Sequence, residues 1–241
     1  MASRTTSRKA SWTVPLILLT VGALIAPTLG AQTVGKLPEV SPFLDVRGGQ
    51  RVGVDFGYLA TGRDPAGVGP KSAPYAGLRY DLHAAGPLYL SSRIFGVAAD
   101  RRVLDYTKKA AARDVGQQSS LLLGADGGFE LALTGDRTWH GVQPLVRASI
   151  GVVAGVTDKR DVSLYAFGTR LMFSYGLGAR WVTGTNSEWR ADLGWFTWAL
   201  KYPETFRSTE GDTLAIRGTG SLTPWVRNRA LTVSYARGIF R

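Results

Sequence analysis

The chain lacks cysteine altogether and has only two histidines among its 241 residues. Without cysteine it forms no disulfide framework and no cysteine-ligated metal site. With two histidines, the side chain most used as a general base near neutral pH is scarce. No cluster of residues has metal-ligand spacing, and no glycine-rich segment opens a helix as a phosphate-binding loop does. We therefore predict no metal, no cofactor and no catalytic residue.

Long apolar runs are also scarce. The longest, from Trp12 to Ile25, is broken by Pro15 and Gly22 and falls short of the roughly 20 residues of a membrane-spanning helix. Basic residues without any acid precede this run, and small residues follow it up to Ala31. This order is typical of a secretory signal peptide, and the short run disfavours an N-terminal membrane anchor. We predict export, with residues 1–31 cleaved.

Acidic residues are in the minority, with 29 Lys and Arg against 18 Asp and Glu and a formal net charge of +11. An excess of this size is typical of nucleic-acid-binding proteins. Here the arginines are scattered singly along the chain instead of gathering on one face, and export leads away from nucleic acid. We therefore predict no nucleic-acid partner.

What the sequence has in abundance is alternation. Apolar or aromatic residues occupy every second position, while glycine, arginine and aspartate occupy the positions between them. A period of two is the signature of a β-strand with two unlike faces. The pattern predicts eight strands, within residues 50–60, 76–83, 88–94, 121–133, 142–152, 167–181, 189–195 and 231–236.

The connections between these strands alternate in length. Long polar stretches occupy residues 61–74, 98–119, 155–164 and 201–223, and short turns occupy 84–87, 134–141 and 183–187. Outer-membrane barrels combine an even number of strands with short periplasmic turns and long external loops. We predict an all-β fold, an eight-stranded antiparallel up-and-down transmembrane β-barrel over residues 50–241. Residues 32–49, rich in proline and glycine, are expected to form a periplasmic lead-in.

A soluble lipocalin-like barrel, apolar inside and polar outside, is the alternative reading of the same alternation. Glycines crowd the polar face, which suits a narrow lumen better than a water-facing exterior. Four aromatic residues stand near strand ends on the apolar face, as in a girdle at a lipid–water boundary. Both features favour the membrane barrel. The four aromatic residues are Tyr80, Trp181, Trp189 and Trp195.

The stretch GLRYDLHAAGPLYLSSRIFG and the closing segment ALTVSYARGIF resemble the small eight-stranded outer-membrane barrels of the OmpA and OmpX type. The resemblance covers residues 50–241. It implies a location in the cell outer membrane, contact with outer-membrane lipid, insertion by the barrel-assembly machinery and a monomeric state. Members usually end on an outward aromatic residue, but here Phe240 is followed by Arg241 and is out of register with Tyr235. A bulge at Gly238 would restore the register.

The polar face supplies the candidate lumen residues. Charges inside a narrow lumen have to be paired, so inward arginines and acids are expected to form one network. Asp126 and Glu130, about 13 Å apart at the usual strand rise, are too far apart to act as a catalytic carboxylate pair. Arginines outnumber acids in the predicted set. It comprises Arg51, Asp55, Arg79, Asp81, His83, Arg93, Asp126, Glu130, Arg147, Arg170, Arg180, Arg190 and Asp192.

Both histidines map to the end with the short turns. We expect His83 to be a lumen residue bonded to its neighbours Asp81 or Arg79, and His140 to be a turn residue. Barrel enzymes that remodel lipid A are similar in architecture, but they act at the external end with a histidine, a serine and an acid. An enzyme of that class is thus an alternative, and a small pore is another.

The external loops are where partner recognition is expected. The second long connection is rich in cations, which either dock lipopolysaccharide phosphates or are merely solvated. We expect a non-enzymatic barrel with a structural or adhesive role carried by these loops. The cations are Arg101, Arg102, Lys108, Lys109 and Arg113.

Overall fold

The structure, a computed structural model, describes residues 41–46, 49–156, 161–183, 186–207, 216 and 220–240. The predicted signal peptide and most of the predicted lead-in lie outside the described residues. The chain divides into Met1–Ser41 and Pro42–Arg241, and the second unit forms an antiparallel barrel. Its wall consists of β2 (Gln50–Ala60), β3 (Ala73–Ala85), β4 (Leu88–Leu104), β5 (Asp114–Ala132), β7 (Val142–Gly155), β8 (Thr169–Val182), β9 (Ser187–Ala199) and β10 (Trp225–Phe240).

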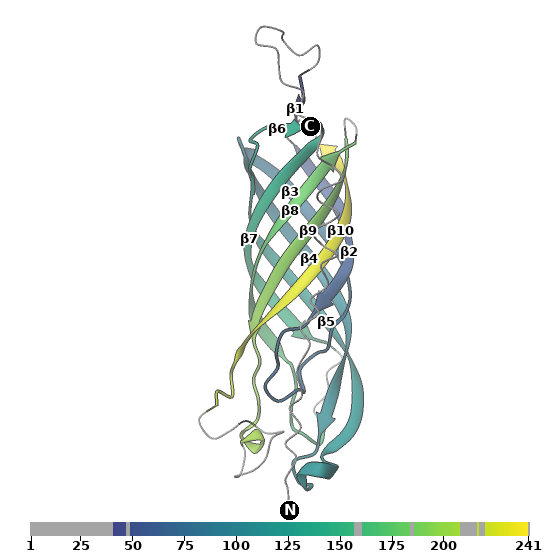
Figure 1. The fold of residues 1–241 in the computed structure, drawn as a ribbon, viewed down its shortest axis with the longest axis vertical. Helices are drawn as coiled ribbons and strands as arrows, with labels where there is room; N and C mark the ends of the chain where they lie inside the picture. The colour runs from purple at the N-terminus through teal and green to yellow at the C-terminus, as the bar shows by residue number, and fades with distance from the viewer. Residues whose placement is uncertain are drawn as a thin grey trace, which may run out of the picture. The chain divides into compact units, whose positions relative to one another are not determined.

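Each wall strand pairs antiparallel with the next one along the chain (Figure 1). The barrel closes where β10 pairs with β2, with Tyr235 opposite Val54. This arrangement confirms the predicted eight-stranded up-and-down barrel. In the described part of the chain, no helix is long and apolar enough to cross a membrane.

The two faces of the wall differ as the alternation predicts. Phe56 and Leu231 are each 62% exposed on the outside, whereas their chain neighbours Asp55 and Ala230 are 2% exposed inside. Successive side chains of a strand point to opposite faces, so one run of sequence supplies both surfaces. The large apolar side chains lie outside and the charged ones inside. A soluble barrel would show the reverse, and the lipocalin-like alternative is therefore excluded.

The connections give the barrel two unlike ends. The long-loop end carries the connections β2–β3, β4–β5, β7–β8 and β9–β10, including the 3₁₀ turns η3 (Ala110–Ala112) and η4 (Glu204–Phe206). The short-turn end carries the connections β3–β4, β5–β7 and β8–β9. In Figure 1 the short-turn end is at the top and the long-loop end at the bottom.

The largest extensions beyond the predicted strands are in β4, β5 and β10. β4 continues to Leu104 and β5 begins at Asp114, so both ends of the predicted loop 98–119 are strand, and β10 begins at Trp225, before its predicted start at residue 231. Asp100 lies opposite Ser119 in the β4–β5 ladder and accepts a hydrogen bond of 2.8 Å from its hydroxyl. The sequence does not predict this extension because its outward residues are polar. The alternation of apolar residues therefore ends while the backbone ladder continues.

The predicted lead-in and one predicted turn contain a further pair of strands. β1 (Phe43–Asp45) pairs with β6 (Arg137–Trp139) at the short-turn end. The Nε of Arg137 lies 3.2 Å from Asp45. The sequence predicts connections without strands for both segments, because three residues are too few to show alternation.

The end of β10 contains the predicted irregularity. Its register against β2 shifts between Gly238 and Phe240, so that Phe240 lies opposite Gln50. The amide of Gly238 donates a hydrogen bond of 2.9 Å to the carbonyl of Asn186. The bulge thus lies where the sequence required one to realign the end of the strand.

Candidate functional site

The lumen changes character along its length. Inward side chains alternate with outward ones, so the inward face of one strand samples the lumen from end to end. On β9 this face is polar at the short-turn end and aromatic toward the long-loop end. From the short-turn end it reads Glu188, Arg190, Asp192, Gly194, Phe196 and Trp198, all of them buried.

In the polar half, Arg79 is shared by three carboxylates. Its guanidinium lies 3.0 Å from Asp81, 3.5 Å from Asp192 and 3.7 Å from Asp55. Asp81 also accepts a 2.6 Å hydrogen bond from Ser91. These groups come from β2, β3, β4 and β9, so the cluster ties opposite sides of the wall together across the lumen.

Arg190 forms a second centre beside the first. Its Nε lies 2.7 Å from both carboxylate oxygens of Asp192, and its Nη1 lies 2.5 Å from Glu130. Because Asp192 also contacts Arg79, the two clusters form one network. All members are nearly excluded from solvent, where an unpaired charge is costly.

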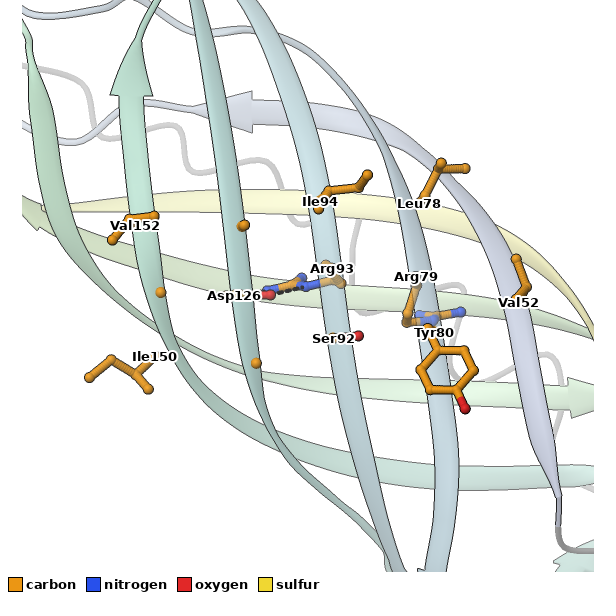
Figure 2. Close-up of a pocket in the computed structure, with 13 residues that line it drawn as sticks. Val52, Leu78, Arg79, Tyr80, Ser92, Arg93, Ile94, Asp126, Ile150 and Val152 are labelled. Atoms are coloured by element: carbon orange, nitrogen blue, oxygen red, sulfur yellow. Dashed lines mark hydrogen bonds and ion pairs between the residues drawn. The ribbon is translucent and has the colours of Figure 1, made fainter.

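Arg93 and Asp126 form a third pair, from β4 and β5, and are joined by dashed lines in Figure 2. Ser149 and Ser174 each donate to the same carboxylate, at 3.0 and 2.8 Å. On the outside of this stretch of wall, Ile94 and its neighbours line a shallow hollow of about 480 Å³. That hollow lies on the apolar exterior.

At the short-turn end, the polar half of the lumen ends in a layer of charged and aromatic side chains, and one of its members, Glu188, is not in the predicted set. Glu188 lies 3.4 Å from Arg51 and 3.8 Å from Arg180. The Arg180 guanidinium carbon stands 4.3 Å from the centroid of the Tyr89 ring, and its Nε donates to Gln143 at 2.5 Å. Glu188 was left out because the seventh strand was predicted to begin at Trp189. Extending that alternation by one residue would have found it.

Including Glu188 balances the charges in the polar half of the lumen, where six arginines face six acids. Over the whole predicted set with Glu188 added, the seven arginines still exceed the acids by one. Arg170 lies near the long-loop end, with its guanidinium 6.0 Å from the centroid of the Phe167 ring. Arg147 is buried, yet no ion pair within 4 Å involves it among the described residues. The balanced set is Arg51, Arg79, Arg93, Arg147, Arg180 and Arg190 against Asp55, Asp81, Asp126, Glu130, Glu188 and Asp192.

Both histidines lie at the short-turn end, as predicted, but His83 has other partners. Its Nε2 lies 2.8 Å from the carbonyl of Gly86 and 3.5 Å from Asp136, so the predicted bonding to Asp81 or Arg79 is wrong. The side chain is therefore part of the turn between β3 and β4. Within the described residues, no group of three or more histidines and acids is placed to hold a metal ion.

The other half of the lumen is filled by an aromatic plug, defined as Tyr75, Phe95, Phe167, Phe196 and Trp198. The rings of Tyr75, Phe95 and Phe196 contact one another with centroids 5.2 to 6.1 Å apart. Phe167 packs edge-on against Trp198 at 6.0 Å. Phe167 is fully buried and precedes β8, so its predicted place on the outward face is wrong.

The plug continues into the long connections as a loop cap, defined as Tyr106, Tyr165, Tyr202 and Phe206. Their rings stack with centroid distances of 4.2 to 6.3 Å, and they share one apolar core with the plug. Tyr202 also donates a hydrogen bond to Asp64, which caps the backbone amides of the first loop. Burial, and then the charge of Asp64, raise the pKa of Tyr202.

The five predicted loop cations do not behave alike. Arg101 is fully buried in β4, where its Nη2 lies 2.8 Å from Asp161 and its guanidinium stands over the Tyr165 ring. It is therefore unavailable to an external partner. β4 continues past the predicted start of the loop, and Arg101 lies on the inward face of this extension. The other four cations remain accessible. Arg102 pairs with Asp114 at 2.7 Å, and Lys108 pairs with Asp105 at 3.6 Å. The guanidinium carbon of Arg113 lies 4.8 Å from the centroid of the Tyr106 ring, and Lys109 is exposed.

A polar hollow of about 620 Å³ lies beside these cations. It is lined by residues of the first long loop and of the extended β4–β5 hairpin. Arg102 is the hydrogen-bond donor that lowers the pKa of the Asp114 carboxyl, so this pair stays ionised near neutral pH. The named lining residues are Gly67, Lys71, Arg102, Asp114, Val115, Gly116 and Gln117.

No protein-family model and no curated protein matches this chain. Among solved structures, Neisserial surface protein A has a TM-score of 0.50 and 12% identity, over 83% of this chain and 98% of that one. The outer membrane protein OprG from Pseudomonas aeruginosa has a TM-score of 0.50 and 8% identity, over 81% and 99%. The fold is that of a small outer-membrane β-barrel. It confirms the predicted resemblance, and the apolar exterior belongs in a lipid bilayer.

Proposed function

We propose that the protein is a closed, non-enzymatic outer-membrane barrel whose structural or adhesive role is carried by the long-loop end. In this proposal the long-loop end faces the outside of the cell, because outer-membrane barrels have short turns in the periplasm and long loops outside. The barrel-assembly machinery is the expected route of insertion.

One observation carries the proposal: the apolar core runs without a break from the aromatic plug into the loop cap. A hydrated ion moving along the lumen would have to shed its water against buried aromatic rings, which is costly. An eight-stranded barrel has an interior just wide enough for side chains to fill. The closed core therefore supports a scaffold over the alternative of a small pore.

The position of the histidines disfavours an outer-leaflet lipid enzyme. His83 and His140 are the chain's two histidines, and both lie at the short-turn end. A lipid-modifying enzyme of the class considered above needs a histidine at the opposite end, beside a serine and an acid. This arrangement supports the proposal of a protein without catalytic activity.

The construction of the loops supports a binding surface. Asp64 and Tyr202 join the first and fourth long connections, and Arg101 and Asp161 join the extended end of β4 to the third. Loops held by buried polar contacts present their exposed residues in a fixed arrangement, which lowers the entropic cost of binding a partner. One of the solved structures similar in fold, Neisserial surface protein A, is named a surface protein.

Conductance measurements test whether the lumen is closed. Purified protein reconstituted in planar bilayers is expected to show no steady conductance, and it should migrate differently on gels before and after heating. A double variant, Phe196→Ala with Trp198→Ala, removes two rings of the plug and is the matched comparison. Stable openings of the unmodified protein would overturn the closed scaffold and establish the pore.

A further inference from the structure

One strand interrupts the apolar exterior of the wall with cations. On β10, Val226, Asn228 and Ala230 are buried inside, so the alternating residues Arg227 and Arg229 face outward. Both are exposed. Further along the same face come Leu231, Val233 and Tyr235, then Arg237. The outward face of β10 is thus an apolar stretch with arginine at each end.

Arg227 and Arg229 lack protein partners in the described part of the chain. Across the ladders, Arg229 lies opposite Ala60 of β2 and Trp195 of β9, and Arg227 lies opposite Thr197 of β9. None of these neighbouring side chains is acidic, so none can form an ion pair with either arginine. Four other cations outside the lumen differ in this respect, since Arg102, Lys108, Arg137 and Arg207 each contact an acid.

The spacing along β10 locates the pair relative to a bilayer. Eight residues separate Arg229 from Arg237, which is about 26 Å of strand at the usual rise and about 20 Å along the normal for a typical tilt. The apolar band of an outer-membrane barrel is about 25 Å tall. Arg227, two residues further, is about 25 Å from Arg237 along the normal, so it lies at the edge of the hydrocarbon at the long-loop end. Arg229 lies just inside that edge, where a long side chain can extend to the head groups.

The surroundings match the layers of a lipid molecule. Trp195 stands beside Arg229, and tryptophan is typical of the level of lipid head groups. Below the arginines, Leu231 lies between Tyr58 and Leu193 on the neighbouring strands, an outward apolar surface for acyl chains. The site thus offers paired cations at head-group level directly above an apolar wall.

We propose that Arg227 and Arg229 bind the phosphate group of an outer-leaflet lipid. Two guanidiniums on alternate positions of one strand start about 7 Å apart, so both reach one phosphate or two neighbouring ones. Arginine can bind phosphate through two parallel charge-assisted hydrogen bonds, which gives the contact both strength and a defined geometry. The proposal rests on the outward orientation of the long-loop end given under Proposed function. It places the contact with lipid phosphate on the outer surface of the wall instead of on the long loops.

The experiment compares lipid retention by three proteins: the unmodified chain, Arg227→Gln with Arg229→Gln, and Arg237→Gln as the control from the other end of the same face. Native mass spectrometry in detergent measures binding of bis-phosphorylated lipid A, its dephosphorylated form and phosphatidylglycerol. The double variant is expected to bind phosphorylated lipid A about tenfold more weakly, whereas the control keeps its affinity. Dephosphorylated lipid A should bind all three proteins equally weakly.

Equal binding of phosphorylated lipid A by the double variant would overturn the site, and so would an equal loss in the Arg237→Gln protein. Full displacement of the lipid by millimolar inorganic phosphate would also overturn it, because a free anion would then be the ligand. Arg227→Lys with Arg229→Lys keeps the charge and should retain most of the binding. Heat-dependent gel mobility reports folding of each variant. Conductance tests the closed scaffold separately, so either proposal can fail without the other.

Discussion

Arg101 and Asp161 form an ion pair of 2.8 Å that joins the extended end of β4 to the connection between β7 and β8. The Arg101 side chain is fully buried, and that of Asp161 is 14% exposed. Gln118 accepts a hydrogen bond from the same arginine nitrogen, at 2.9 Å. The pair therefore holds the long β4–β5 hairpin against its neighbouring loop.

Replacing Asp161 with alanine is expected to loosen this hairpin. Removing one partner of a buried ion pair leaves the other charge uncompensated and typically costs about 3 to 5 kcal/mol. Because the contact lies at the long-loop end of β4, the loss should appear as local opening instead of unfolding of the barrel. Hydrogen exchange of residues 98–104 and 114–119 should accelerate, while that of the rest of β4 and β5 and of the other wall strands stays unchanged.

The adjacent residue supplies the control. Arg102 pairs with Asp114 at 2.7 Å, but both side chains are more than 30% exposed. An exposed ion pair contributes about 0 to 1 kcal/mol, so Arg102→Ala should hardly change hydrogen exchange in the hairpin. Equal acceleration in both variants would mean that Arg101 is no more important than a surface cation.

A second prediction separates two buried arginines. Arg190 contacts Glu130 and Asp192, whereas Arg147 is buried without an ion pair within 4 Å among the described residues. Arg190→Met leaves the buried Glu130 without an ion pair to any described residue and Asp192 with Arg79 alone, and should cost about 3 to 5 kcal/mol. Arg147→Met removes a cation that has no direct acid and should be neutral or stabilising. Urea-induced unfolding in detergent measures both, and a larger loss for Arg147→Met would contradict the contacts described here.

The barrel could be predicted from sequence because a lipid-facing strand leaves a regular record. Phe56 and Tyr58 alternate with Asp55 and Gly57, and each outward residue must be apolar to face lipid. Where the wall leaves the lipid, that constraint ends. At Asp100 and Arg102 the outward face is polar, so the strand continues without an apolar signal. Strand existence was predictable, and strand ends were not.

The lumen residues were predictable as a set, but their contacts were not. Inward charge follows from alternation, whereas pairing depends on the register between strands that are distant in sequence. Arg79 meets Asp192 across the lumen, a contact that no spacing along one strand encodes. The aromatic plug is not predicted by the sequence for a related reason. Phe196 lies beyond the predicted end of its strand, and Phe167 continues the alternation of β8, which predicts an outward position for it.

A third prediction uses two adjacent glycines of β5. A Cβ on Gly128 would lie 2.1 Å from the carbonyl oxygen of Ala148 on β7, a backbone atom that cannot move without breaking the ladder. A Cβ on Gly127 meets nothing within 4 Å on the outer surface. Gly128→Ala should therefore prevent the heat-resistant folded form on gels, and Gly127→Ala should fold normally. Normal folding of both would show that the β5–β7 spacing is adaptable.

The last prediction concerns pH and the loop cap. Tyr202 donates a hydrogen bond to Asp64, and burial beside that carboxylate raises the pKa of its phenol above the ordinary value of 10.0. The unfolded loop would lose this proton first, so the contribution of the contact is fully present below pH 10 and declines as pH rises above it. Proteolysis of the long loops should hence be constant from pH 7 to about 10 and increase beyond that. Tyr202→Phe leaves Asp64 without one donor, which should cost about 1 to 3 kcal/mol at neutral pH and weaken this alkaline dependence. An unchanged alkaline dependence in Tyr202→Phe would assign the titration to another group.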